Sequence, residues 1–240
     1  MITLKRIAAV GVVLFASLSM AMGQTSGQRE MSVEESYLQD SVELMIIREQ
    51  SRSDSRDMKF VALEYIRDAI ARGNTGEEMR STLDYLALEG SANRTHENGR
   101  LVNNYPDVRL RAATYLGDLG TAEAKDTLIK VILAENEPMV LAEAVKSLAR
   151  IGLNDNEETV NAISWVITRF DVLNPDNTLA LSALDAYEKF AEISGGIKDP
   201  TTIRAIMRIV ESGSYTRIVK ERAQQILANL RRSSNSESQR

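Results

Sequence analysis

The chain has 240 residues, of which 43% are hydrophobic, with a formal net charge of −5, one histidine and no cysteine. This length allows one or two ordinary domains. The lack of cysteine excludes disulfides and thiolate metal sites. The acidic balance argues against broad binding of nucleic acid, which requires a basic surface.

Residues 1–23 have the layout of a secretory signal peptide. Lys5 and Arg6 precede an apolar run at residues 7–22, and residues 21–23 form a small-x-small cleavage site before Gln24. The apolar run is shorter than the roughly 20 residues that span a bilayer, which favours a cleaved leader over a membrane anchor. Removing those two cations takes the net charge from −5 to −7. We therefore expect a periplasmic or secreted protein with no stable membrane insertion after cleavage.

Residues 24–53 are interpreted as a polar linker followed by one helix. Residues 32–35, Ser-Val-Glu-Glu, form a capping box, and Leu38, Val42 and Met45 follow on one side at helical spacing. A lone amphipathic helix of this kind is expected to cover the open end of a helical array.

A motif at residues 106–120 recurs at residues 138–152. Both copies read Pro-x-Val, then Ala four residues after the Val, Leu four later, Leu or Ile three further on, and a closing Gly. Pro in the first turn and Gly at the C-cap are typical of a helix, so the two copies predict the same helix in two successive repeats. A repeat of this period predicts an all-α fold, an α-solenoid of helix pairs.

The same frame places five first helices between residues 54 and 231. Their anchoring alanines are Ala62, Ala112, Ala144, Ala183 and Ala223. In the first repeat Met58 takes the place of Val108. Only half a repeat follows residue 215, so the last helix is expected to close the stack, with a disordered tail at residues 232–240.

The second helices share a buried stripe, which leaves one residue of each helix on the opposite side. The four outward residues are Tyr85, Lys130, Trp165 and Arg208, and Arg169 and Arg204 lie one turn away on the last two helices. Tyr, Trp and Arg are enriched at binding hot spots, so these residues are candidates for partner binding. The alternative is that they are ordinary exposed residues, or that Trp165 packs against a neighbouring loop.

Residues 90–105 interrupt the repeats with an Asn-, Gly- and Ser-rich stretch. Long loops inserted between repeats often carry contacts, although an unselected flexible loop is the alternative. The only histidine of the chain, His96, lies here beside Glu97.

Residues 106–135 resemble a HEAT-like repeat of the bacterial type also found in phycobilisome lyases. The resemblance is carried by Asp107, Val108, Arg109, Ala112, Ala113, Leu116, Gly117, Leu119 and Gly120. It implies that first helices form a convex side and that second helices line a concave side that commonly binds proteins. Hydroxylases of this architecture hold two irons with several His-Glu pairs, and one such pair cannot supply those ligands. Nothing in the chain supports a lyase, since no nucleophile–base pair is recognisable.

The sequence therefore favours a non-catalytic, extracytoplasmic scaffold or adaptor that binds another extracytoplasmic protein along the concave face. The alternative is an accessory or regulatory subunit of an envelope assembly or enzyme that acts through residues 90–105. No catalytic, cofactor-binding or metal-binding residue is expected, and nucleic acid is not an expected partner.

Overall fold

The computed structural model describes residues 33–197 and 199–237. The chain forms two compact units, residues 1–40 and 41–240. The expected signal peptide, the linker up to residue 32 and residues 238–240 lie outside the described residues. Across the described part of the chain, no helix combines the length and the hydropathy needed to cross a membrane.

The described chain is an all-α solenoid with one small hairpin, as predicted. Its helices are α1 (Val33–Arg52), α2 (Arg56–Ala71), α3 (Glu77–Leu88), α4 (Pro106–Leu119), α5 (Ala122–Ala134), α6 (Pro138–Ile151), α7 (Glu158–Leu173), α8 (Asn177–Ser194), α9 (Pro200–Glu211) and α10 (Arg217–Glu237). Strands β1 (His96–Glu97) and β2 (Arg100–Leu101) pair antiparallel between α3 and α4, and a 3₁₀ turn at Asp155–Glu157 precedes α7.

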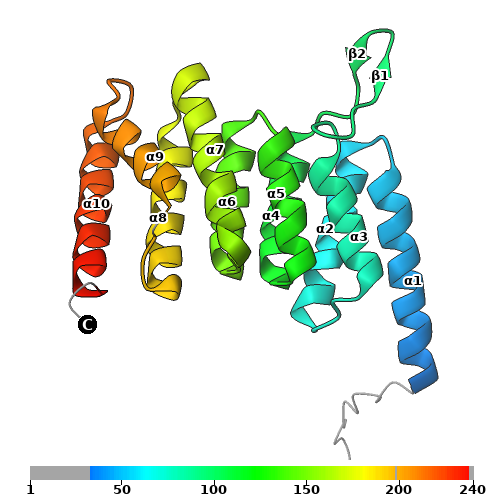
Figure 1. Cartoon of the computed structure of the whole chain (residues 1–240). Helices are drawn as coiled ribbons and strands as arrows, with labels where there is room; N and C mark the ends of the chain where they lie inside the picture. Colours follow the sequence, from blue (N-terminus) through cyan, green and yellow to red (C-terminus); the bar gives the residue numbers. More distant parts are fainter. Residues whose placement is uncertain (1–32, 198, 238–240) are drawn as a thin grey trace, which may run out of the picture. The chain divides into compact units, whose positions relative to one another are not determined.

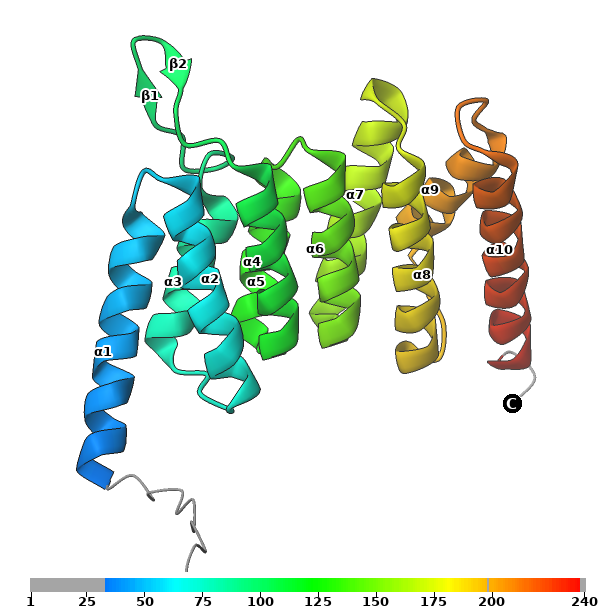
Figure 2. The same ribbon diagram turned by 180° about the vertical axis from the view of Figure 1, so that it is seen from behind.

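The helices of residues 41–240 stand side by side in two layers (Figures 1 and 2). The first helices α2, α4, α6, α8 and α10 neighbour one another, and so do the second helices α3, α5, α7 and α9. All five anchoring alanines are fully buried, which confirms the predicted register. Small side chains at these points let the helices approach closely, and each pair buries its apolar stripe against its neighbours.

The two matching motifs form α4 and α6 as expected. Each helix has Pro in its first turn, and Gly120 and Gly152 close them with left-handed φ angles of 69° and 75°. Inside the motif, Gly117 faces the next first helix. A Cβ there would lie 2.7 Å from the Ser147 side chain, so the α4–α6 crossing requires glycine.

The buried side of α1 differs from the predicted one. Within residues 41–52, Ile47 and Ser51 are buried, whereas Val42 and Met45 are exposed. The helix is oriented by polar contacts that hydrophobic spacing does not register, since Arg72 donates to both oxygens of Glu43 at 2.5 and 2.7 Å.

Two further predictions, for Met58 and for the C-terminal tail, were wrong. Met58 is exposed and Lys59 is buried in its stead. Helix α7 continues to Leu173, and Asp176 caps α8 by accepting a hydrogen bond from the Leu179 N–H. The tail expected to be disordered from residue 232 is helical to Glu237.

Candidate functional site

Four outward residues of the second helices form a row on the exposed face of that layer. We call Tyr85, Lys130, Trp165 and Arg208 the second-helix row. All four are exposed, with Tyr85 at 37% and Trp165 at 43%, while the residues on either side of the row, such as Val131 and Val166, are fully buried. Because α3, α5, α7 and α9 are consecutive neighbours, the row crosses all four helices of the layer.

Trp165 lies beside Arg169 on α7. The guanidinium carbon of Arg169 is 5.3 Å from the centre of the Trp165 ring, within the range of a cation–π contact. Arg169 also donates to the backbone oxygen of Glu135 at 3.3 Å and to the side-chain oxygen of Asn136. The half-buried Arg169 thus ties α7 to the α5–α6 connection and supports the indole from one side.

Arg204 and Arg208 line a hollow of about 370 Å³ beside α7 and α9. Arg208 Nε is 3.7 Å from Asp171 Oδ2, and its side chain remains 47% exposed. Arg204 Nη2 donates to Thr201 at 3.3 Å. Asp171 is also the hydrogen-bond partner of Tyr215, whose pKa is raised by burial first and then by that carboxylate. Asp171 is therefore shared, and the long contact leaves Arg208 open to a second anion.

Lys130 makes no ion pair with any residue that the structure describes. Its charge acts on the half-buried Asp84, whose pKa is raised by burial despite the charges of Arg80 and Lys130. Asp84 is held by Arg80 at 2.8 Å on its own helix. Lys130 consequently presents an uncompensated cation in the centre of the row.

Charge is divided along the second helices. The first turns of α3, α5 and α7 are acidic, with Glu77, Glu78, Glu123 and Glu158 there, whereas the first turn of α9 has no acid. Acids at helix N-termini interact favourably with the helix dipole. Trp165 lies midway along α7, and the other three residues of the row lie in the C-terminal halves of their helices, so the rings and cations of the row are separated from these acids. A partner that covers the row meets a surface suited to acidic and aromatic groups.

Behind the row, each of the first two repeats holds one buried ion pair, and a hydrogen bond from Arg109 joins the two repeats. Lys59 Nζ donates to Glu89 at 2.9 Å, and Tyr85 donates its hydroxyl hydrogen to the same carboxylate at 3.2 Å. Arg109 Nε donates to Glu135 at 2.6 Å and Nη1 donates to the Glu89 backbone oxygen at 3.2 Å. Sequence reasoning missed these pairs, although both cations stand three residues before an anchoring alanine. Tyr85 is therefore held in place by this buried network.

The interruption at residues 90–105 is an ordered hairpin, and it projects from the edge where α3 ends and α4 begins (Figure 1). Gly90 has a φ of 75°, and a Cβ there would lie 2.2 Å from the Asn103 backbone oxygen. The Asn103 side chain accepts from Thr95 N–H and donates to Asn93 O, both at 2.9 Å. Its tip, including His96, is exposed. The stem, not the tip, is thus fixed to the solenoid.

Residues 100–168 match the family described as HEAT repeats. None of the curated proteins compared with the chain matches it. Among solved structures, the chain is similar to a de novo designed 16-helix transmembrane nanopore, with 16% identity over 85% of this chain and a TM-score of 0.25. The chain spans 64% of the length of that designed chain, and so weak a likeness carries no argument. Residues 100–168 thus resemble HEAT repeats, and the stacked helix pairs of the solenoid agree with that resemblance.

Proposed function

We propose that the protein is a non-catalytic scaffold that binds another extracytoplasmic protein along the second-helix layer. The observation that carries this proposal is the second-helix row, which sets two aromatic rings and two cations on the exposed side of four adjacent helices. HEAT repeats are commonly protein-interaction scaffolds, and residues 100–168 match that family.

The row is suited to binding because its residues are both exposed and supported. Tyr85 is held by Glu89, and Trp165 is backed by Arg169. Side chains already held in one conformation lose less entropy on binding than free ones do. The rigid layer then supplies affinity through a few anchors rather than through one deep cavity.

Export remains part of the proposal, and the leader-like residues 1–23 support it. Mass spectrometry of the protein isolated from envelope and culture fractions should find Gln24 at its N-terminus. A soluble cytoplasmic protein that keeps Met1 would contradict export but leave the binding face untouched.

The binding proposal is tested by site-specific photocrosslinking. A benzophenone amino acid at Lys130, inside the row, should capture a partner, while the same group at Lys189, exposed on α8 in the other layer, should not. In the first variant, the added pair Trp165→Ala and Arg208→Ala should lower capture at least about tenfold, since two hot-spot losses exceed 1.4 kcal/mol. Undiminished capture by this variant would refute the row as the binding site.

The hairpin supports a second candidate function, that of an accessory subunit that binds its target through the tip. Its stem is anchored while its tip is exposed. Val102 N–H donates to Thr95 O at 3.0 Å, so an Asn-Gly turn in place of residues 96–101 would close the same stem. Loss of the partner in this variant, with capture from Lys130 unaffected by Trp165→Ala and Arg208→Ala, would favour the hairpin over the row.

A further inference from the structure

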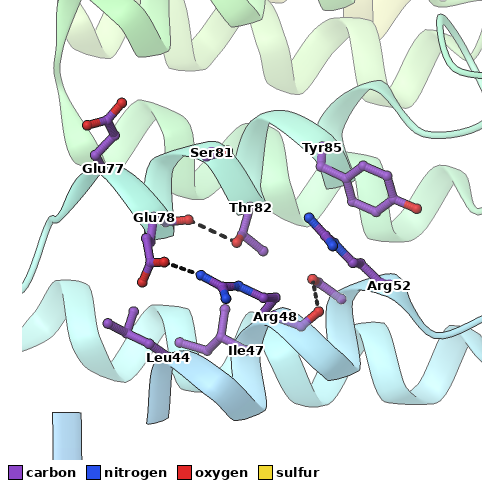
Figure 3. Close-up of a pocket in the computed structure, with 10 residues that line it drawn as sticks. Leu44, Ile47, Arg48, Arg52, Glu77, Glu78, Ser81, Thr82 and Tyr85 are labelled. Atoms are coloured by element: carbon purple, nitrogen blue, oxygen red, sulfur yellow. Dashed lines mark hydrogen bonds and ion pairs between the residues drawn. The ribbon is translucent and has the colours of Figure 1, made fainter. Parts of the chain in front are cut away.

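A pocket of about 550 Å³ lies between α1 and α3 at one end of the second-helix layer (Figure 3). Its lining comes from the last turns of α1 and the outer side of α3, all within residues 41–240. Leu44 and Ile47 give it an apolar floor, and Tyr85 of the second-helix row forms part of its wall. The pocket is therefore continuous with the row.

The two arginines of the pocket differ in whether their charge is paired. Arg48 forms an ion pair with Glu78, so those two charges offset each other. Arg52 makes no ion pair or hydrogen bond with any described residue, and Figure 3 shows its side chain turned toward Thr82 and Tyr85. One uncompensated cation thus faces the pocket.

The groups around Arg52 are hydrogen-bond donors or are already occupied. Thr82 donates its hydroxyl to Glu78 O at 2.9 Å, and Tyr85 donates to Glu89. Ser81 lines the pocket, is exposed and has no hydrogen-bond partner among the described residues. Arg52 and Ser81 therefore offer free donors, and no free carboxylate of α1 competes for them inside the pocket.

We infer that this pocket binds the carboxylate of an acidic side chain from a protein segment that lies along the second-helix row. This inference rests on the proposed function and adds the chemistry of the partner. The segment reaches the pocket because Tyr85 belongs to both sites. A single carboxylate fits better than a phosphate dianion, because only one cation is uncompensated and Glu77 at the rim carries a negative charge.

The next cation of the row, Lys130, is one helix further along the layer. Neighbouring helices lie about 8–10 Å apart, and an extended chain advances about 3.3 Å per residue. The bound segment is thus expected to be extended and to place a second acidic residue, opposite Lys130, about three positions from the one in the pocket.

Disulfide tethering tests the pocket without the partner. Because the chain has no cysteine, Ser81→Cys introduces one thiol at the pocket wall. The variant is equilibrated in a redox buffer with 3-mercaptopropionate, cysteamine, 2-mercaptoethanol or 2-mercaptoethylphosphonate, and mass spectrometry measures the mixed disulfides. The carboxylate should exceed the amine, and adding Arg52→Gln should lower that ratio about fivefold, as one unit charge at close range predicts.

Lys189→Gln in the Ser81→Cys background is the matched control, since it removes the same charge from the other layer. An unchanged ratio in the Arg52→Gln variant, or a phosphonate occupancy above that of the carboxylate, would overturn the inference. The outcome is independent of photocrosslinking from Lys130. A carboxylate preference without capture at Lys130 would support the carboxylate site but contradict the proposed scaffold function. Capture at Lys130 without a carboxylate preference would contradict the carboxylate site alone.

Discussion

The first two repeats and the later ones bury different kinds of side chain at the same position of their first helices. Three residues before the anchoring alanine, α2 and α4 carry the buried cations Lys59 and Arg109, whereas α6 and α8 carry Leu141 and Ala180. The cations pair with Glu89 and Glu135, which follow the second helices. Charged groups this deeply buried are stable only when paired.

The difference follows the connections between repeats. Glu89 precedes the hairpin, and Arg109 binds both the Glu89 backbone and the Asn104 side chain, the latter at 3.0 Å. The buried guanidinium therefore satisfies the Glu89 backbone oxygen, which the long connection leaves without a helix partner. Later repeats have no such hairpin and use apolar contacts. We expect the first region to adopt one specific packing but to lose stability when a buried charge is removed. The later region should tolerate substitutions at the equivalent positions better.

Removing the buried cation of α4 should have the largest effect. Arg109→Leu leaves Glu135 buried without its charged partner, and the free energy of unfolding should fall by about 3–5 kcal/mol. Leu141→Met, at the equivalent place on α6, should cost less than about 1.5 kcal/mol. Chemical denaturation measures both, and equal losses would erase the contrast between the regions. Glu135→Gln added to Arg109→Leu should recover part of the loss.

The junction between the two regions is the crossing of α4 and α6. Gly117→Ala should destabilise the protein by about 1–3 kcal/mol, because the new Cβ overlaps the Ser147 side chain. Gly213→Ala is the control, since no atom lies within 4 Å of a Cβ there. Thermal unfolding should separate the two variants, and Ser147→Gly should partly rescue Gly117→Ala. If Gly117→Ala left the thermal stability unchanged, the crossing of α4 and α6 would have room for a Cβ.

The N-caps of α9, in the later region, and α2, in the first, also differ. Asp199 caps α9 by accepting from Thr202 N–H at 2.8 Å, whereas Ser55 makes no side-chain cap at α2. Asp199→Ala should cost about 1 kcal/mol, and Ser55→Ala should cost only a few tenths. Urea titrations at neutral pH compare the two.

The Asp199 cap should depend on pH. Burial acts to raise the pKa of Asp199, but hydrogen bonds from Thr202 and Thr201 outweigh it and hold the pKa below the ordinary value. A carboxyl with a lowered folded pKa stabilises the protein above its unfolded pKa, and this is lost as pH falls through the folded pKa. The difference in unfolding free energy between Asp199→Ala and wild type should therefore shrink in acid below about pH 4. A pH-independent difference would contradict a charged cap.

The smallest effect is expected at the hairpin tip. Replacing residues 96–101 with Asn-Gly should change the unfolding free energy by less than about 0.5 kcal/mol, since the tip is exposed. Gly90→Ala, at the stem, should cost more because its φ of 75° and the Asn103 backbone exclude a Cβ. If the tip change were the more costly of the two, the stem would not be the anchor.

The sequence alone determined the helical register of this protein. The spacing of Val108, Ala112 and Leu116 recurs because apolar positions must lie on one side of each helix. The same rule correctly predicted that all four residues of the second-helix row are exposed. The repeated motif also located Gly120 and Gly152 at the helix ends, because a glycine C-cap depends only on the local backbone conformation.

Only the tertiary structure decided the buried polar contacts. Residues 30 apart meet in the Lys59–Glu89 pair, and residues 26 apart meet in the Arg109–Glu135 pair. Hydrophobic spacing treats such charges as exposed, so it misplaced Met58 and the buried side of α1. The pocket beside Arg52 likewise needs both α1 and α3. Each of these features depends on which helix lies opposite, and that is a property of the stacked repeats rather than of any single helix.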